Sequence, residues 1–274
     1  MERTELLRSL INIDGFGLEI GPSFRPLVKK SSGAKVETVD YTDAAGLRDH
    51  YKGNKGVDPA NIEEVDYVVQ GGSILATIGR RDYYDYIVAS HVIEHTPDML
   101  GFLKDCELLL KEGGILLLAV PDKRHCFDVF QPLSSTGMVL QAHLDKRTRP
   151  AAGAIFDDWA YNAVRNGEIG WPIDASGDLR FFLEFNDPKA LLTQAQGAVG
   201  YVDVHTWRFV PSSFRLIVND LYQTGEIRLR EDKFFDSVGN EFYVTLSKQG
   251  RGCPVDRLRL AKQMLIEHSQ IRVA

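Results

Sequence analysis

Apolar and polar positions alternate most clearly over residues 82–122, where an apolar strand, a helix and a second apolar strand follow one another. Residues 87–89 form a short apolar run of the kind found in buried parallel strands, and residues 115–120 form another. Residues 96–98 (Thr-Pro-Asp) predict a helix start with the threonine as N-cap and the proline at the first helical position. Gly113 and Gly114 predict the end of that helix. A strand, a helix and a strand in this order imply a right-handed parallel crossover, which assigns the chain to the α/β class.

Further apolar runs complete a mostly parallel sheet of seven strands that ends in an antiparallel hairpin. The other strands are expected at residues 17–20, 35–40 and 65–69, and at residues 226–232 and 241–248 around a turn at 238–240. Helices are expected at residues 5–10, 41–51, 211–221 and 254–268.

The pattern divides the chain into three parts. Residues 1–122 form the α/β core, and residues 205–274 complete it with a helix, the hairpin and a terminal helix. Residues 123–204 show no regular alternation of strands and helices but contain Trp159 and Trp171. A long irregular insertion after a core strand is typically a functional lid or a disordered segment. Its aromatic content favours an ordered lid that binds substrate.

Composition excludes several classes of protein. The chain has 274 residues, a net charge of −6 and a pI near 5.7, which argues against nucleic acid as a partner, because phosphate binding needs a basic face. The basic residues of 144–150 are best interpreted as a solvated loop, with contact to an acidic substrate as the alternative. The longest apolar run is too short for membrane insertion, and the first ten residues lack the apolar core of a signal peptide. The three cysteines are widely spaced and odd in number, which favours a reducing cytoplasm.

Three residues at the ends of the first two strands carry the predicted ligand chemistry. Glu19 and Gly21 lie at the end of the first strand, and ligands of open parallel sheets bind beyond the carboxyl ends of their strands. Gly21 lets the backbone pass close to a ligand without a side chain. Asp40 ends the second strand, where a carboxylate can accept hydrogen bonds from both hydroxyls of a ribose. A cap or turn role is the alternative for Asp40, and the three residues together favour ribose.

These motifs resemble those of the class I S-adenosylmethionine-dependent methyltransferases, which have a Rossmann-like sheet. LEIGPS (residues 18–23) is similar to the first-strand motif and VDY (39–41) to the acidic end of the second strand. YDYIVASHVIEH (84–95) and KEGGILLLAVPD (111–122) are similar to the fourth- and fifth-strand motifs. The resemblance covers roughly residues 10–125 and implies S-adenosylmethionine as cofactor, S-adenosylhomocysteine as product and a small molecule as methyl acceptor.

The resemblance also implies roles for individual residues. It places Glu19 near the methionine amino group, Asp40 on the ribose and Tyr41 against the adenine. It assigns the remaining cofactor contacts to the first turn, the loop after the third strand and the end of the fourth strand. Those residues are Gly21, Pro22, Ser23, Gly72, Ser73, Ser90 and His91.

The chain departs from the family pattern at two places. Ser23 and Arg25 replace the later glycines of the first turn, which makes the turn stiffer. Gly71-Gly72-Ser73 stands where the family has an aspartate for the adenine amine, so adenine recognition rests on backbone groups.

Histidines are the candidate general bases, because histidine titrates near neutral pH. His125 follows the fifth strand, His205 lies where the chain returns to the core, and His91 lies at the end of the fourth strand. Asp122 and Asp128 are candidates for orienting a substrate or a histidine. A metal site of His91, Glu94 and His95 is weighed and not predicted, because a strand-to-helix turn makes these side chains diverge.

The leading hypothesis is methyl transfer to an oxygen or nitrogen of a sugar, nucleotide-sugar or surface-glycan precursor. A nicotinamide-dependent oxidoreductase is one alternative, although the GxGxxG phosphate turn is absent. A non-catalytic scaffold that keeps the methyltransferase core is the other, supported by the altered glycine turn. The sequence leaves the acceptor and the oligomeric state open, with a homo-oligomer among the alternatives.

Overall fold

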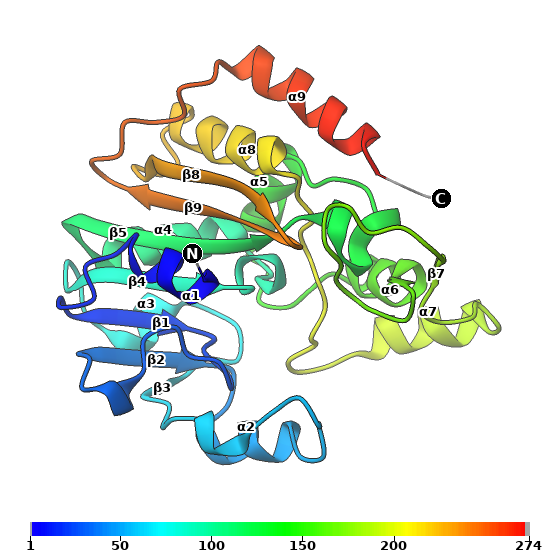
Figure 1. Ribbon diagram of the computed structural model, residues 1–274, viewed down its shortest axis with the longest axis horizontal. Helices are drawn as coiled ribbons and strands as arrows, with labels where there is room; N and C mark the ends of the chain where they lie inside the picture. The colour runs from blue at the N-terminus through cyan, green and yellow to red at the C-terminus, as the bar shows by residue number, and fades with distance from the viewer. Residues whose placement is uncertain (1, 272–274) are drawn as a thin grey trace.

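A single twisted sheet organises the computed structural model, which describes residues 2–271. Its seven strands lie in the order β3-β2-β1-β4-β5-β9-β8 (Figure 1). The parallel strands are β1 (Gly17–Ile20), β2 (Val36–Asp40), β3 (Tyr67–Val68), β4 (Tyr84–Ser90) and β5 (Leu110–Pro121). Strands β8 (Arg230–Val238) and β9 (Glu241–Ser247) form the antiparallel hairpin, and β9 pairs antiparallel with β5. The predicted seven-stranded, mostly parallel α/β fold is confirmed.

Side chains alternate between the two faces of each strand. Both faces of the sheet therefore carry apolar side chains, and helices cover both. Ile87 and Leu118 point into the larger apolar cluster, and Val88 and Leu117 into the smaller one. The larger cluster contains α3 (Ile74–Ile78), α4 (Met99–Leu109), α5 (Thr136–Leu144) and α8 (Pro211–Gln223). The smaller cluster contains α1 (Arg3–Arg8). Helices α2 (Ala44–His50) and α9 (Arg257–Ser269) lie at the periphery.

The insertion after β5 (residues 123–204) is ordered and has short elements of its own, and we keep the name lid for it. It contains η4 (Lys123–His125), η5 (Phe127–Phe130), α5, α6 (Ala152–Tyr161) and α7 (Pro188–Gly197). Strands β6 (Ala163–Arg165) and β7 (Leu179–Phe181) form a separate two-stranded sheet. Helices α6 and α7 contact each other and lie to one side of the large sheet (Figure 1). Ile155, Ala195 and Val204 form a small apolar core within the lid.

Several predicted boundaries differ from the structure, and three of these differences have a clear structural reason. Helix α4 starts at Met99, and its N-cap is Asp98, whose carboxylate accepts from the amide of Gly101. The preceding Thr96 instead donates its hydroxyl to the carbonyl of Ile93 in the turn η3 (Ile93–His95). The helix ends at Leu109, so Gly113 and Gly114 lie inside β5.

The third difference concerns the hairpin, whose first strand was expected at residues 226–232. Strand β8 begins only at Arg230, and Ile227 and Leu229 pack into the larger core cluster before the strand starts. Ile227 and Leu229 are two positions apart and both buried, and this apolar alternation is what predicted a strand here. Among residues 2–271, no helix has both the length and the apolarity needed to cross a membrane.

The observed N-cap can be tested by replacing Asp98 with alanine. We expect Asp98→Ala to lower the free energy of unfolding by about 1–2 kcal/mol, because the first turn of α4 loses its side-chain acceptor. Asp98→Asn should lower the free energy of unfolding less, because asparagine caps helices as well as aspartate does. Urea unfolding followed by circular dichroism measures both. Equal stability of the alanine variant and the wild type would place the cap elsewhere.

Candidate cofactor and acceptor site

The carboxyl ends of three strands meet at one edge of the sheet. Ile20 of β1 pairs with Val39 of β2 on one side and with Ala89 of β4 on the other. The next residues along these strands, Asp40 and Ser90, therefore lie at the same edge as the turn after β1. The strand order reverses beside β1, and open α/β sheets bind ligands at such a switch point.

The turn after β1 is bound to the end of β2. Gly21 adopts φ of 64°, and a Cβ added there would lie 2.7 Å from Cγ2 of Val92. Its amide donates to the carbonyl of Val39 at 2.7 Å. The amide of Ser23 donates to Oδ2 of Asp40 at 3.1 Å. The turn therefore passes close to the carboxylate that the sequence assigns to ribose, and only glycine fits at its first position.

Asp40 is 5% exposed, and its carboxylate is held by backbone donors. Oδ1 accepts from the amide of Tyr41 at 2.8 Å, and Oδ2 accepts from Ser23. Burial raises the pKa of Asp40, and the two amides oppose that shift. Each carboxylate oxygen has a second lone pair, so both can still accept a hydrogen bond from a diol. The residues at this edge thus fit a nucleoside cofactor.

Tyr41 is covered by the lid. Its ring stacks on the ring of Tyr201 with centroids 4.4 Å apart and an angle of 10° between the planes. Tyr201 in turn donates its hydroxyl to Asp203 at 3.2 Å. The lid segment before the return to the core therefore contacts the residue that the sequence assigns to the adenine.

Glu19 contacts the chain's own backbone. Its carboxylate oxygens accept from the amides of Leu27 and Val28 at 2.6 and 2.9 Å, and the residue is 2% exposed. Burial raises the pKa of Glu19 to about 7, although the two amides oppose the shift. The structure thus gives Glu19 a role in fixing the loop after β1, and its contact with a methionine amino group stays a prediction.

The other predicted cofactor residues lie in turns around this edge. The carbonyl of Pro22 accepts from the amide of Arg25 at 2.9 Å. Gly71, next to Gly72, adopts φ of 84°, and a Cβ added to it would lie 2.5 Å from the carbonyl oxygen of Thr148 in the lid. Ser73 is the N-cap of α3 and accepts from the amide of Ala76. The loop after β3 thus borders the lid.

Ser90 and His91 belong to a charged cluster at the end of β4. Nε2 of His91 lies 2.8 Å from Oε2 of Glu241, at the start of β9. Arg3 donates to both oxygens of Glu241 and, at 2.8 Å, to the hydroxyl of Ser90. Burial opposes the charged imidazole, but the hydrogen bond to Glu241 and nearby carboxylates outweigh it and raise the pKa of His91. This cluster ties the N-terminal helix and the hairpin to the candidate site.

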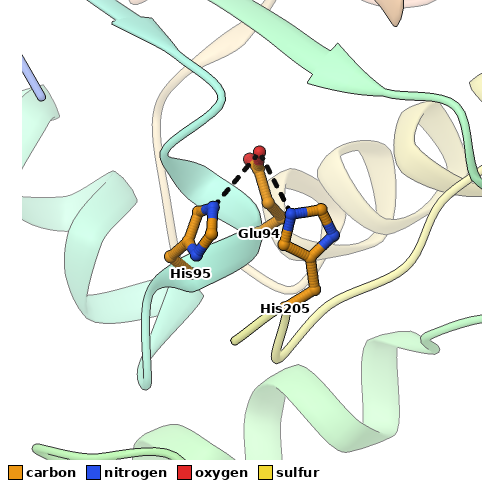
Figure 2. Close-up of side chains that lie close together, drawn as sticks. All are labelled: Glu94, His95 and His205. Atoms are coloured by element: carbon orange, nitrogen blue, oxygen red, sulfur yellow. Dashed lines mark ion pairs between the residues drawn. The ribbon is translucent and has the colours of Figure 1, made fainter. Parts of the chain in front are cut away.

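A second cluster joins the turn after β4 to the lid, and we call Glu94, His95 and His205 the Glu94 site. The three side chains converge, with both imidazoles facing the carboxylate (Figure 2). Nε2 of His95 and Nε2 of His205 lie 3.8 and 3.9 Å from Oε1 of Glu94. On their far sides, Nδ1 of His205 lies 2.5 Å from Oδ2 of Asp128, and Nδ1 of His95 lies 3.0 Å from Oδ1 of Asp203.

Hydrogen bonds that involve backbone groups hold the two halves of this cluster together. The carbonyl of Glu94 accepts from the amides of Thr206 and Trp207 at 2.7 and 3.1 Å. The indole of Trp207 donates to the carbonyl of Thr96 at 2.6 Å. The amide of His205 donates to Asp158 of α6 at 3.0 Å. The returning chain is therefore fixed against the turn after β4.

Opposite charges set the protonation of the cluster. Burial disfavours a charged His95, but the contact with Asp203 and the charge of Glu94 outweigh it and raise the pKa of His95 to about 9. Burial also disfavours an ionised Asp128, yet the neighbouring His205 and Arg208 lower its pKa. Asp128 is therefore the ionised partner that orients the His205 ring.

The three candidate bases thus occupy different surroundings. His205 joins the Glu94 site, and Nδ1 of His91 lies 3.6 Å from Oε1 of the same Glu94. His125 lies on η4, where its carbonyl accepts from the amide of Trp171 at 2.9 Å. Sequence reasoning named Asp128 as an orienting residue but did not single out Asp203, Glu241 or Arg3. Each of these comes from a segment remote in sequence, and no local pattern links it to the site.

Comparison with known proteins identifies the family. A family model described as "Methyltransferase domain" matches residues 16–177, more than half of the chain. The chain belongs to this methyltransferase family. Together with the strand order, this makes it a methyltransferase of class I, the class that uses S-adenosylmethionine.

Individual relatives are distant. A ubiquinone biosynthesis O-methyltransferase of Parvibaculum lavamentivorans is 35% identical over 68 residues, which are 24% of this chain and 26% of that protein. The chain thus spans about a quarter of the curated relative that it matches.

Solved structures resemble the chain over most of its length but at low identity. One is an S-adenosylmethionine-dependent methyltransferase from Mesorhizobium loti, with 11% identity, a TM-score of 0.44 and coverage of 88% of this chain and 95% of that one. Another, from Rhodobacter sphaeroides, is named a zinc-dependent alcohol dehydrogenase. Its identity is 13%, its TM-score 0.48, and the coverage 90% and 89%.

The Glu241 cluster predicts a pH-dependent contribution to stability. Burial alone would raise the pKa of Glu241, but hydrogen bonds from Arg3 and His91 lower it to about 2. A carboxylate with a depressed pKa stabilises the fold above its unfolded pKa and loses that contribution as pH falls through the folded value. We expect Glu241→Gln to lower the free energy of unfolding by at most about 3 kcal/mol at neutral pH. The effect is limited because Arg3 is partly exposed and solvent screens its pair with Glu241.

Unfolding in urea at a series of pH values between neutrality and about pH 3 tests this expectation. The difference in free energy of unfolding between the wild type and Glu241→Gln should narrow once the pH falls below about 4.5. A gap that stays constant over that range would show that Glu241 does not titrate with a depressed pKa.

Proposed function

We propose that the protein transfers the methyl group of S-adenosylmethionine to an oxygen of a small molecule bound under the lid. Gly21, Ser23 and Asp40 would hold the cofactor at the edge formed by β1, β2 and β4, with Tyr41 beside them. The cofactor supplies an electrophilic sulfonium methyl when bound, so the protein mainly has to align the acceptor and exclude water. Membership in the methyltransferase family and the register of the three strands support this reaction.

The buried pair of Asp128 and His205 carries the proposal that the methylated atom is a hydroxyl oxygen. Transfer to a hydroxyl needs a group that accepts its proton, whereas a neutral amine can react without one. Asp128 is 1% exposed and fixes Nδ1 of His205, so that Nε2 faces the end of β4. An imidazole oriented by a buried carboxylate is a common arrangement for a general base. His205 is the proposed proton acceptor, and His91 and His125 are the alternatives.

A cavity in the lid supports a phosphorylated acceptor, such as a nucleotide sugar, over a neutral one. The cavity measures about 300 Å³, and Lys146, Arg147 and Arg149 line it. Two other lining residues, Ile155 and Ala195, pack against Val204, which precedes His205. Cations in this cavity suit an acceptor that carries phosphate groups. Arg147 also pairs with Asp145 at 2.7 Å, and Arg149 donates to the carbonyl of Ala198 at 3.2 Å.

The role of His205 can be tested by His205→Ala. We expect turnover to fall roughly 10²- to 10⁴-fold, the usual effect of losing a general base. The dissociation constant for S-adenosylmethionine should stay nearly unchanged, because His205 is not among the residues assigned to the cofactor. Radiolabelled methyl transfer to candidate nucleotide sugars measures turnover, and calorimetry measures cofactor binding.

His125→Ala, prepared in parallel, tests the alternative base, and His268→Ala on α9 is the matched control. Wild-type turnover in His205→Ala would remove His205 from the mechanism. A comparable fall in His268→Ala would show that the assay responds to general destabilisation.

A further inference from the structure

Glu94 is a buried carboxylate that has imidazoles at ion-pair distance but is hydrogen-bonded to none of them. It is 0% exposed, and neither of its carboxylate oxygens has a hydrogen-bond partner among the described residues. Burial of an ionised carboxylate is costly unless the group is paired, hydrogen-bonded or bound to a metal. Its neighbours His95 and His205 stop at 3.8 and 3.9 Å, too far for hydrogen bonds.

The three side chains fit a single cation between them. One ligand atom from each of Glu94, His95 and His205 lies within 4.8 Å of the others, and both imidazoles face the carboxylate of Glu94 (Figure 2). Bonds from nitrogen or carboxylate oxygen to Zn²⁺ are about 2.0–2.2 Å long. Two ligands of one tetrahedral ion therefore lie about 3.3–3.6 Å apart. The distances from Glu94 to both histidines exceed this by a few tenths of an ångström, so small side-chain movements are needed to complete the site.

Each histidine is also oriented as a metal ligand would be. Nδ1 of His205 contacts Asp128, and Nδ1 of His95 contacts Asp203, which leaves both Nε2 atoms on the Glu94 side. Histidines that bind metals usually donate their other ring N–H to a carboxylate, which fixes the tautomer and the ring plane. The hydrogen-bonded pair of Asp128 and His205 follows this pattern, and the carboxylate of Asp203 lies at ion-pair distance from Nδ1 of His95.

We propose that Glu94, His95 and His205 bind one divalent first-row transition-metal ion, for which Zn²⁺ is the representative. Imidazole nitrogens favour zinc, iron, nickel and copper, whereas Mg²⁺ and Ca²⁺ prefer oxygen ligands. Two histidines and one carboxylate leave at least one coordination position open, as in catalytic rather than structural metal sites. The turn after β4 and the returning chain supply the ligands, and the backbone bonds between Glu94 and residues 206–207 hold them in place.

Metal binding and proton transfer compete for one atom. Nε2 of His205 cannot coordinate a cation and accept a proton from the acceptor at the same time. If His205 acts as the free base proposed above, Zn²⁺ lowers turnover and a chelator restores it. Turnover that requires Zn²⁺ would contradict the free-base role while leaving the metal site intact, so the two proposals fail separately.

Calorimetric titration of Zn²⁺ into chelator-treated, tag-free protein tests the site without cofactor or acceptor. We expect one ion per chain in the wild type. Glu94→Gln and His205→Gln should each raise the dissociation constant at least about tenfold, and Asp128→Asn should do so by removing the group that orients His205. His268→Gln, on the peripheral helix α9, should bind as the wild type does.

Circular dichroism establishes that each variant is folded, and two ligand variants keep the test decisive if one of them unfolds. Loss of binding in the folded ligand variants, with binding retained in His268→Gln, supports the site. The proposal is overturned if the wild type binds no Zn²⁺, or if Glu94→Gln and His205→Gln bind it as tightly as the wild type does.

Discussion

The parallel pairing of β1 with β2 on one side and β4 on the other is the constraint on which the rest of the structure depends. Because the pairing places Ile20 opposite both Val39 and Ala89, it brings the turn at Gly21 beside Asp40 and Ser90. The crossovers on either side of β1 run in opposite directions, which opens the sheet edge at this point to a ligand. A change of register by one residue would turn the side chains of β1 to opposite faces and separate these groups.

The lid depends on this frame, because its return to the core is fixed to the turn after β4. The carbonyl of Glu94 binds the amides of Thr206 and Trp207, and Trp207 then packs in the main core. This attachment brings His205 and its partner Asp128 to the sheet edge. Oppositely charged groups lie together here with little exposure to solvent, so the stability of each charged group depends strongly on its partner. The same low exposure that makes these residues costly to bury makes them suited to proton transfer or metal binding.

The sheet was largely predictable from sequence, and the boundaries of its helices less so. Apolar runs such as residues 115–120 have few alternatives to a buried strand. The first-strand motif placed Gly21 directly after β1, and the second-strand motif placed Asp40 at the end of β2. The cap of α4 was misplaced because Thr96 and Asp98 are both good N-caps, and only the structure shows which one reaches an amide of the first turn. Similarly, Gly113 and Gly114 are typical of a helix end but continue β5.

The polar clusters could not be predicted, because they join residues that are remote in sequence. His91, Glu94 and His95 were expected to diverge from their turn, so no metal site was expected; this was wrong, because Nδ1 of His91 and Nε2 of His95 lie 3.6 and 3.8 Å from the same oxygen of Glu94. The structure adds His205, more than a hundred positions later, and its Nε2 faces the same carboxylate. The contact of Glu241 with Arg3 and His91 similarly depends on β9 pairing antiparallel with β5. Such contacts follow from the topology rather than from any local motif.

The central claim is that the turn at Gly21 and the carboxylate of Asp40 form one nucleoside site at the sheet edge. Calorimetric titration of S-adenosylmethionine, with NAD as the comparison ligand, into wild type and Asp40→Asn tests it most directly. The account predicts binding of one S-adenosylmethionine per chain, no binding of NAD, and an affinity for S-adenosylmethionine in Asp40→Asn lower by roughly 1–3 kcal/mol. Wild-type affinity in a folded Asp40→Asn, or no binding of S-adenosylmethionine by the wild type, would contradict it.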